Sequence, residues 1–323
     1  MTVHPPSMGQ IRYRHPTEED IAQIVRAWNT SRKEIPLERD STIGELRGDI
    51  FDDEDYDVVG SWIAEAEGEV VGFGRGIVER KRLETGRLEG LVTVEVVPDY
   101  RGIGIEEEIM DRVLAYLRSK RLERAEHSCP TLTGWRNALF EEYGFEDVRR
   151  FFRMVRKGLD PLKDIRIPAG VCFEKKIFKD ADDGDVSLMV STLNDTFSEH
   201  FGFSPMSDNR WLRLRDAYED YGIMTFAVRA GRTVGMCFSD ESVLYNREHG
   251  TKAGWVWIVG VKKEERGKGV GRALLTDSVS WLNGRGMDSV YLGVDAENRN
   301  ALDLYTSLGF EVLHESIYYR LAL

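Results

Sequence analysis

The chain has 323 residues, which suits two domains of ordinary size, and its hydrophobic content of 41% is typical of globular proteins. The formal net charge of −12 argues against nucleic acid as a partner, because neutralising phosphates needs a basic face. The sequence has neither an apolar run near the roughly 20 residues of a membrane span, nor an apolar signal core, nor enough cysteines for a zinc site, which predicts a cytoplasmic protein without membrane or metal.

The first half of the chain contains a strand pattern that leads into a short glycine turn. Apolar residues from Val94 to Val97 precede Arg101-Gly102-Ile103-Gly104, and Phe151 to Val155 is predicted to be the last strand of the first domain. A charged stretch with two glycines and two prolines, Lys157 to Gly170, then predicts a boundary between domains of residues 1–160 and 161–323.

The second half shows strand and helix patterns in an order that suits a second α/β domain. In chain order we expect a strand from Val171 to Phe173, a helix from Val186 to Phe197, a hairpin of Thr225–Val228 and Thr233–Phe238, a central strand from Trp255 to Val261, a strand from Ser289 to Val294, a helix from Asn298 to Leu308 and a closing strand from Tyr318 to Leu323. Gly309 follows the last helix, where it would act as the C-cap.

The most informative segment reads Arg266-Gly267-Lys268-Gly269-Val270-Gly271 and lies between the central strand and an apolar helix pattern. Glycines let the chain turn tightly and bring backbone N–H groups close to an anion, and the N-terminus of the following helix adds a partial positive charge. Glycine turns also serve as plain connections, so the segment predicts a phosphate cradle only with further support.

That support comes from Asn298 to Phe310, which has the pattern Asn-x-x-Ala-x-x-Leu-Tyr-x-x-x-Gly-Phe. Together with Arg-x-x-Gly-x-Gly after a Val-Gly-Val strand end, it resembles the two signature motifs of the GCN5-related N-acetyltransferases. The resemblance covers at least Val171 to Leu323. It implies an acetyl-CoA-dependent acyltransferase with a splayed, mostly antiparallel mixed sheet flanked by helices.

The glycine turn has an earlier copy. Arg101 precedes Arg266 by 165 positions, and the same offset relates Asn29 to Asn194. A repeat of this length predicts two domains rather than a solenoid. The expected fold is therefore α/β (α+β), with two tandem acetyltransferase-like domains.

By the resemblance, the pantetheine arm of acetyl-CoA would pair with the central strand and its pyrophosphate would lie on the glycine turn. The amine would attack directly, Tyr305 would protonate the departing thiolate, and Phe197 to Trp211 would form a helical flap over the acceptor. The candidate cofactor-binding residues are Val259, Gly260, Val261, Arg266, Gly267, Lys268, Gly269, Val270, Gly271, Arg272, Asn298, Ala301 and Tyr305.

Plainer roles stay open for three of these residues. Tyr305 has helical spacing from Ala301 and Leu308 and could pack in the core. Asn298 could only cap its helix, and Lys268 could face solvent.

The sequence does not single out a general base. Many family members carry a glutamate on the central strand, and mycothiol synthases, which share the tandem layout, carry it about six residues before the last valine, where this chain has Trp255. The base would then be another side chain or a chain of water molecules. The candidates are Asp240, Glu241, Asp295, Glu297 and His200. Of these, Glu241 and Asp295 are taken as catalytic together with Tyr305.

The first copy departs from the motifs. At the 165-residue offset it has Glu106, Phe140, Thr133 and Arg136 where the second copy has Gly271, Tyr305, Asn298 and Ala301. A glutamate suits a helix N-terminus but repels a pyrophosphate, and phenylalanine has no proton to give. The sequence therefore predicts a degenerate first domain that keeps the fold without the chemistry.

The expected function is acetyl transfer from acetyl-CoA to a primary amine of a small molecule or peptide, in the C-terminal domain. The acidic balance would suit a cationic acceptor. Two alternatives stay open: acetylation of a cysteinyl pseudodisaccharide, as in mycothiol synthases that share the tandem layout, and a non-catalytic acyl-CoA-binding or regulatory protein. Trp255 in place of a carboxylate speaks against the first of these.

Overall fold

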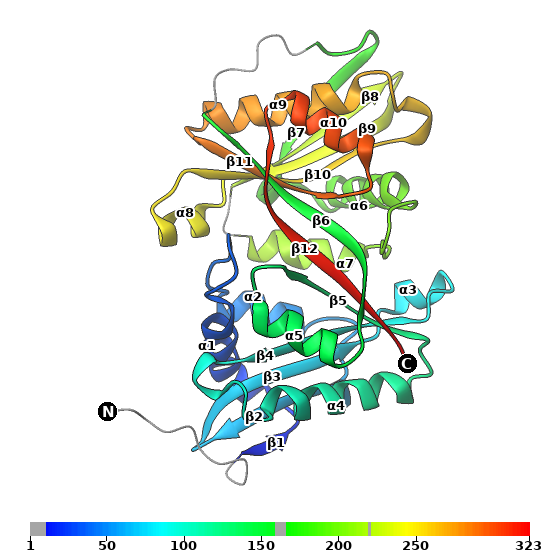
Figure 1. The fold of residues 1–323 in the computed structure, drawn as a ribbon. Helices are drawn as coiled ribbons and strands as arrows, with labels where there is room; N and C mark the ends of the chain where they lie inside the picture. The colour runs from blue at the N-terminus through cyan, green and yellow to red at the C-terminus, as the bar shows by residue number, and fades with distance from the viewer. Residues whose placement is uncertain (1–10, 159–165, 219–220) are drawn as a thin grey trace. The chain divides into compact units, whose positions relative to one another are not determined.

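The computed structural model describes residues 11–158, 166–218 and 221–323 (Figure 1). Contacts between Cα atoms divide the chain into two compact units. Unit 1 is Met1–Arg149 together with Ser316–Leu323, and unit 2 is Arg150–Glu315. The boundary expected between residues 160 and 161 lies outside the described residues, and the division by contacts falls earlier, at Arg150.

Unit 1 contains a sheet with the strand order β1-β2-β3-β4-β5-β12. Neighbouring strands are antiparallel except β4 and β5, which are parallel. The strands are β1 (Arg12–Arg14), β2 (Ser61–Ala66), β3 (Glu69–Ile77), β4 (Glu89–Val96), β5 (Arg124–Pro130) and β12 (Glu311–Ala322), of which Ser316–Ala322 pairs with β5. The helices are α1 (Ile21–Arg32), α2 (Ile43–Ile50), α3 (Arg80–Glu84), α4 (Ile105–Ser119) and α5 (Gly134–Glu142).

Unit 2 contains a sheet with the strand order β6-β11-β10-β9-β8-β7, in which β10 and β11 are parallel and the other neighbours antiparallel. The strands are β6 (Glu146–Lys157), β7 (Val171–Ile177), β8 (Gly222–Arg229), β9 (Arg232–Asp240), β10 (Ala253–Val261) and β11 (Ser289–Asp295). The helices are α6 (Asp183–Phe197), α7 (Asp208–Ala217), α8 (Val243–His249), α9 (Val270–Gly284) and α10 (Arg299–Ser307). Both units thus have a mixed, mostly antiparallel sheet with helices, which confirms the expected α/β class.

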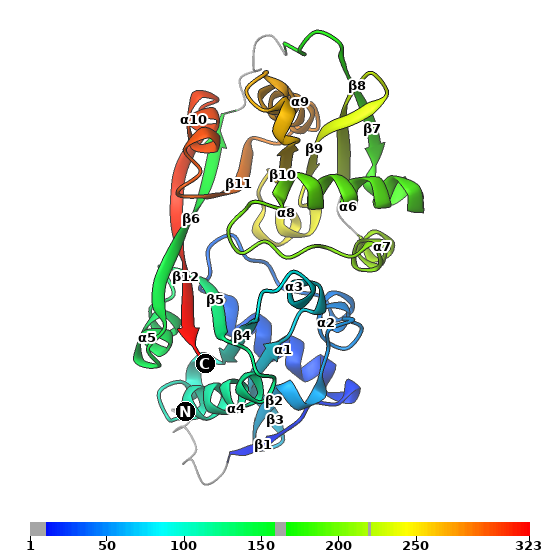
Figure 2. The ribbon, with the colours of Figure 1, turned by 90° about the vertical axis from the view of Figure 1, so that its right-hand side faces the viewer.

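Helices cover both faces of the sheet in unit 2. Helix α9 places Leu274 and Val279 in a core with Val256 of β10, and α6 places Val190 in a second core with Phe238 of β9. Figures 1 and 2 show α9 and α6 on opposite sides of these strands. The central strand is therefore buried on both faces, as its apolar run predicts.

The two long helices of unit 2 begin at residues that favour a helix start. Before α6, the Asp182 carboxylate accepts a hydrogen bond from the Asp185 N–H at 2.8 Å, and the Asp185 carboxylate accepts from the Asp182 N–H at 3.3 Å. Helix α9 follows Gly269, whose φ of +84° is a conformation that glycine adopts without strain. Both starts are local in sequence, which explains why they could be placed from it.

The 165-residue repeat is preserved in single hydrogen bonds. Arg101 donates to the backbone carbonyls of Ser31 and Val96, at 3.0 and 2.9 Å. Arg266 donates to the carbonyls of Thr196 and Val261, which stand 165 positions later, both at 3.0 Å. The same arginine thus ties the glycine turn to the first long helix in each unit.

Two strands have partners in the other half of the sequence. The expected strand from Phe151 forms part of β6, but it pairs with β11 in unit 2. The expected closing strand forms part of β12, but Ser316–Ala322 pairs with β5 in unit 1. The prediction that each strand closes the domain of its own half was wrong, because two similar repeats offer equivalent sheet positions and the residue pattern alone cannot choose between them.

Two further elements differ from expectation. The segment expected to form a flap, Phe197 to Trp211, becomes helical again only at Asp208, in α7. Helix α8 was not predicted. None of its residues is buried, so its sequence lacks the apolar periodicity from which a helix is recognised.

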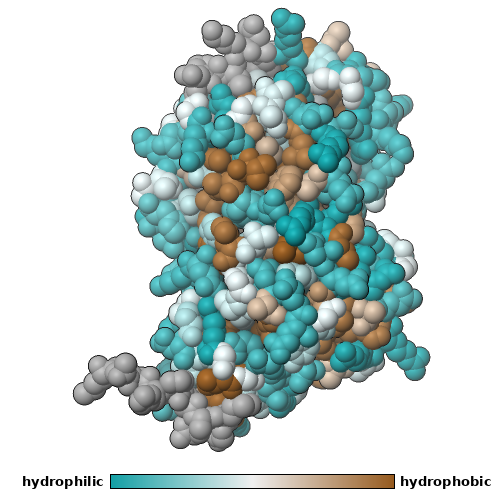
Figure 3. Space-filling model, viewed as in Figure 1, coloured by the Kyte–Doolittle hydropathy of each residue, from teal (hydrophilic) through white to brown (hydrophobic). Residues whose placement is uncertain are grey.

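On the face drawn in Figure 3, hydrophilic side chains predominate, with apolar areas between them. Among the helices that the structure describes, none has both the length and the apolar character needed to cross a membrane.

Candidate active site

Strands β10 and β11 of unit 2 separate partway along their length. They pair only from Ala253 to Val256 of β10, whereas β10 stays paired with β9 as far as Val261. The pairing with β9 shifts register between Val256 and Ile258, so that Trp257 forms a bulge. Beyond the bulge, one edge of β10 presents backbone groups that β11 does not take, and an extended ligand can pair there.

The separated part of β10 lies close against helix α6. A Cβ atom at Gly260 would come within 2.3 Å of the Thr196 hydroxyl oxygen and 3.1 Å of the Phe197 ring. Only glycine fits, because α6 packs directly against this stretch of backbone. The predicted residues Val259, Gly260 and Val261 therefore lie together along the separated edge.

The glycine turn that follows β10 has the backbone of an anion cradle. Gly267 and Gly269 have φ values of +75° and +84°, and α9 begins at Val270, so the N–H groups of its first turn lie beside the glycines. Gly271 has no positive φ, and a Cβ atom there would meet the Val261 side chain at an ordinary 3.5 Å. This position could carry a side chain, so its glycine is not required by the fold.

Arg266 serves the fold more than it serves a ligand. Its guanidinium donates to the carbonyls of Val261 and Thr196, and its Nη1 lies 3.2 Å from a carboxylate oxygen of Glu199. All three nitrogens are engaged within the unit. Arg266 therefore holds the glycine turn against the end of α6.

Two other basic side chains flank the turn. Lys268 is exposed, with its Nζ 3.4 Å from a carboxylate oxygen of Glu265, and Arg272 donates to the Ser307 hydroxyl at 2.6 Å. The ion pair of Lys268 contributes little stability, and the Arg272 guanidinium is bonded to a neutral hydroxyl group, so both cations can turn to a phosphate. These residues can add positive charge to the cradle.

Helix α10 carries the second motif. The Asn298 side chain accepts a hydrogen bond from the Ala301 N–H at 3.2 Å, so it does cap the helix. Tyr305 is 9% exposed and belongs to the core that α9 and β11 share. Burial raises the pKa of Tyr305 to about 12, so the phenol holds its proton at neutral pH.

The candidate bases differ in their surroundings. The Glu241 carboxylate accepts from Arg285 Nε at 2.7 Å, and Glu297 is exposed. The Asp295 carboxylate accepts from the Glu297 N–H at 2.9 Å. Burial lowers the pKa of His200, and the nearby charge of Asp295 opposes that shift. The charge of Asp295 thus acts on His200, whereas Glu241 is paired with Arg285.

Asp240, at the end of β9, is a buried carboxylate beside the bulge. It accepts hydrogen bonds from the Tyr218 hydroxyl at 2.5 Å, the Trp257 indole N–H at 2.6 Å and the Ser242 hydroxyl at 2.8 Å. Ser242 has a φ of +46°, which is unusual outside glycine and is maintained by these contacts. Asp240 therefore fixes the side chains next to the separated strands.

Trp255 stands where the resemblance led us to look for a glutamate. It is buried and stacks on Trp257 with ring centroids 4.8 Å apart, and the Tyr291 ring lies 5.2 Å away. These contacts make it part of an aromatic cluster on the α6 side of the sheet.

Unit 1 repeats the cradle but fills it with its own side chain. Gly102 and Gly104 have φ values of +73° and +93°, and Glu106 Oε1 accepts from the Gly102 N–H at 2.9 Å. Glu106 is 5% exposed, and burial raises the pKa of its carboxyl group. The carboxyl group thus takes an N–H that a phosphate would use.

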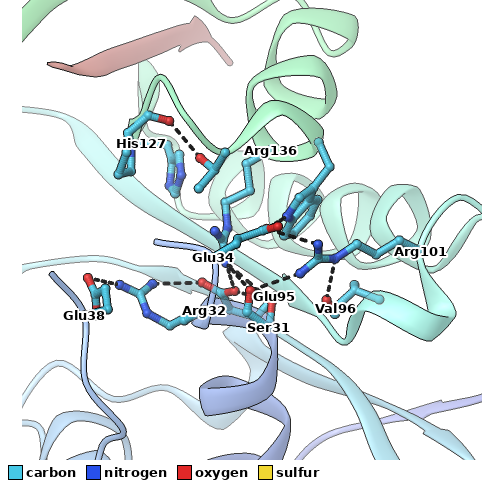
Figure 4. Close-up of polar contacts among 12 residues, drawn as sticks. Ser31, Arg32, Glu34, Glu38, Glu95, Val96, Arg101, His127 and Arg136 are labelled. Carbon is cyan, nitrogen blue, oxygen red and sulfur yellow. Dashed lines mark hydrogen bonds and ion pairs between the residues drawn. The ribbon is translucent and has the colours of Figure 1, made fainter. Parts of the chain in front are cut away.

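A buried ion network bridges the gap between β4 and β5 in unit 1 (Figure 4). β4 pairs with β5 only over three residues. Further along, Arg136 of α5 donates to Glu95 of β4, which also accepts from the Ser31 hydroxyl at 2.6 Å and from Arg32 at 2.9 Å. The network occupies the space into which the strands open.

Unit 2 has small, uncharged residues at the equivalent positions. Glu95, Glu106 and Arg136 correspond to Gly260, Gly271 and Ala301. Two of the three replacements were predicted from the sequence, and Glu95 was not. Its place between Val94 and Val96, in an otherwise apolar run, was the signal that could have revealed it.

Comparison with known proteins agrees with this geometry. The profile described as "Acetyltransferase (GNAT) family" matches residues 21–145 and 187–310, once in each repeat. The mycothiol acetyltransferase of Thermobispora bispora is 32% identical over 180 residues, which are 55% of this chain and 59% of that protein. The mycothiol acetyltransferase of a Nocardioides species is 28% identical over 234 residues, 68% of this chain and 76% of that protein.

Two solved structures share the fold over nearly the whole chain. A GCN5-related N-acetyltransferase from Sphaerobacter thermophilus has a TM-score of 0.68 at 22% identity and covers 98% of this chain and 97% of its own. A tandem GNAT protein from the clavulanic acid biosynthesis pathway has a TM-score of 0.73 at 15% identity and covers 97% of this chain and 98% of its own. The tandem arrangement is thus found in a protein of very different sequence.

Proposed function

The chain belongs to the acetyltransferase (GNAT) family, and we propose that unit 2 transfers an acetyl group from acetyl-CoA to a primary amine. One observation carries the proposal: unit 2 keeps a separated strand edge, a glycine cradle and a buried tyrosine, whereas unit 1 has side chains in the same places. The named relatives support acetyl transfer as the reaction.

Acetyl-CoA fits the residues of unit 2. The pantetheine arm would pair with backbone groups of Val259 to Val261, where a Cβ at Gly260 would clash with α6. The pyrophosphate would lie on the N–H groups of Gly267 to Gly271, with charge from Lys268 and Arg272. Ala301 leaves room where Arg136 fills the gap in unit 1.

The reaction is a direct transfer. The amine nitrogen attacks the thioester carbonyl carbon, the C–S bond breaks, and the thiolate leaves. A backbone N–H of the separated edge would stabilise the oxygen that gains charge. Tyr305 would protonate the thiolate, since its pKa of about 12 keeps the phenol protonated until a strong acceptor forms beside it.

We propose that His200 accepts the proton of the attacking amine. Burial lowers the pKa of this imidazole, so it is neutral near pH 7 and able to accept a proton. The carboxylate of Asp295 would stabilise the imidazolium that forms. Glu241 is the weaker candidate, because the Arg285 guanidinium holds its carboxylate at 2.7 Å.

We propose that unit 1 has no catalytic role and binds no acetyl-CoA. Glu106 occupies its cradle, and the Arg136–Glu95 pair crosses its gap. The purified chain should therefore bind one acetyl-CoA in titration calorimetry. Two sites of similar affinity would contradict this part of the proposal.

The test of the function is thiol release from acetyl-CoA in the presence of a panel of amines. Release that requires an amine, with the acetylated product detected by mass spectrometry, is the expected result. Binding of acetyl-CoA without release for any amine would instead indicate a non-catalytic acyl-CoA-binding protein.

A second acceptor has a specific observation in its favour, since the relatives described above are named mycothiol acetyltransferases. The cysteinyl pseudodisaccharide that precedes mycothiol therefore belongs in the panel. A kcat/KM for it far above that for simple amines would identify this chain as an enzyme of that kind.

A further inference from the structure

Trp257 is 51% exposed although it lies in the central strand of unit 2. An indole that is half open to water beside a candidate site presents an aromatic face that a ligand can use. Its position is informative, because the bulge at Trp257 is also the point where β10 leaves β11. The indole therefore stands at the start of the edge proposed to hold the thioester.

The indole ring is held rigidly. Its N–H donates to Asp240 at 2.6 Å, and its ring stacks on the Trp255 ring with an interplanar angle of 12°. Asp240 is in turn fixed by Tyr218 and Ser242. A rigid aromatic side chain loses little entropy on binding, which suits it to recognition of a ligand.

The same aromatic cluster already holds a positive charge. The Arg153 guanidinium carbon lies 4.7 Å from the centroid of the Trp255 ring. The negative face of an indole attracts cations, and a carboxylate bonded to its N–H strengthens that attraction. The Trp257 ring is half exposed and its N–H is bonded to Asp240, so it offers a second indole face on which a cation can bind.

We propose that Trp257 binds a second positively charged group of the acceptor, so that the substrates of unit 2 are diamines or similar dications. This rests on the proposed acetyl transfer. Two residues of strand span about 7 Å from Trp257 to Val259, so an acceptor whose two charges are about that far apart would reach both the ring and the thioester. The net charge of −12 favours the approach of such a molecule.

The main variant is Trp257→Val, which removes the aromatic ring and keeps a β-branched residue that suits a strand. Trp257→Phe keeps a smaller aromatic face without the N–H. Tyr221→Ala is the control, because this aromatic ring is also exposed and also has a guanidinium over it, that of Arg285 at 4.2 Å.

The experiment compares 1,5-diaminopentane with 1-aminopentane, which has the same length and one charge fewer. In the unmodified enzyme, kcat/KM for the diamine should exceed that for the monoamine by about five- to thirtyfold. Trp257→Val should bring the ratio close to the statistical value of about two, since either amine of the diamine can react, whereas Trp257→Phe should keep part of the excess and Tyr221→Ala all of it. The acetyl-CoA dissociation constant should change by less than about twofold in every variant.

The outcomes separate the two proposals. A kcat/KM ratio no higher than the statistical value in the unmodified enzyme overturns the inference and leaves acetyl transfer intact. An equal loss for both amines in Trp257→Val also overturns it, since that result indicates a structural role for the ring. If neither these amines nor any other of the panel releases thiol, the proposed function itself fails.

Discussion

Arg136 donates a hydrogen bond to Glu95 inside unit 1, at the two positions where unit 2 has Ala301 and Gly260. One repeat thus joins helix and strand through buried charges, and the other has only a hydrogen atom and a methyl group at the same two positions.

Removing Arg136 should destabilise unit 1 strongly. Arg136 is 1% exposed, so Arg136→Ala leaves the buried Glu95 with less compensation, and we expect a loss of roughly 3 kcal/mol in the free energy of unfolding. Urea unfolding measures it. Arg26→Ala is the control, because Arg26 pairs with Glu69 at the surface of the same unit and should cost less than about 1 kcal/mol. Similar losses in the two variants would show that the buried pair has no special weight.

Gly271→Glu copies into unit 2 the residue that fills the cradle of unit 1. We expect the new carboxylate to take the Gly267 N–H, as Glu106 takes that of Gly102, and to lower acetyl-CoA affinity at least about tenfold, more at low salt. Isothermal calorimetry at two salt concentrations measures this. Gly284→Glu is the control, since it adds the same charge near the other end of α9, where a Cβ meets nothing within 4 Å. Unchanged affinity in Gly271→Glu would mean that the turn does not hold the cofactor.

Tyr305→Phe should lower kcat by about 10² to 10⁴ with little change in acetyl-CoA affinity, because proton donation acts in the transition state. Steady-state kinetics and calorimetry on the same preparation separate the two effects. Since the pKa of Tyr305 is about 12, this group should not limit kcat up to about pH 11. A variant with full activity would reduce Tyr305 to a core residue.

His127 should make unit 1 less stable as the pH falls. Its Nδ1 lies 2.8 Å from the Val92 carbonyl oxygen, and burial lowers the pKa of its imidazole to about 4. Between pH 6.5 and 4, the unfolded chain takes up a proton that the folded chain refuses, so stability is lost as pH falls through this range. We expect a contribution of about 1 to 2 kcal/mol between pH 7 and pH 5.

The matched variant is His127→Leu, since Leu292 stands at the equivalent position of unit 2. Urea unfolding at both pH values should show a smaller pH dependence in the variant than in the unmodified chain. Equal pH dependence in the two proteins would show that His127 does not titrate in this way.

Features with a local cause could be predicted from the sequence. The glycine turns were recognisable because Gly267 and Gly269 adopt positive φ angles that other residues avoid. The Asn298 cap and the helix that follows it depend on neighbouring residues only. These local features also include most of the candidate cofactor site.

Features that depend on a distant partner could not be predicted. Nothing near Glu95 announces that Arg136 will meet it, and nothing within Ser316–Ala322 shows that β5 will be its neighbour. The partner of Glu241 was equally hidden, because Arg285 lies at the end of a helix 44 residues away. The choice among candidate bases therefore needed the structure.

The placement of Ser316–Ala322 against β5 has a consequence for how the chain is made. A ribosome adds about 5–20 residues per second, so β5 emerges on the order of ten seconds or more before the strand that covers its edge. During that time the nascent chain carries an unpaired strand edge, which is the kind of surface that recruits chaperones or pairs with a neighbouring chain. The first repeat, although synthesised first, therefore finishes folding only after the whole of the second has been translated.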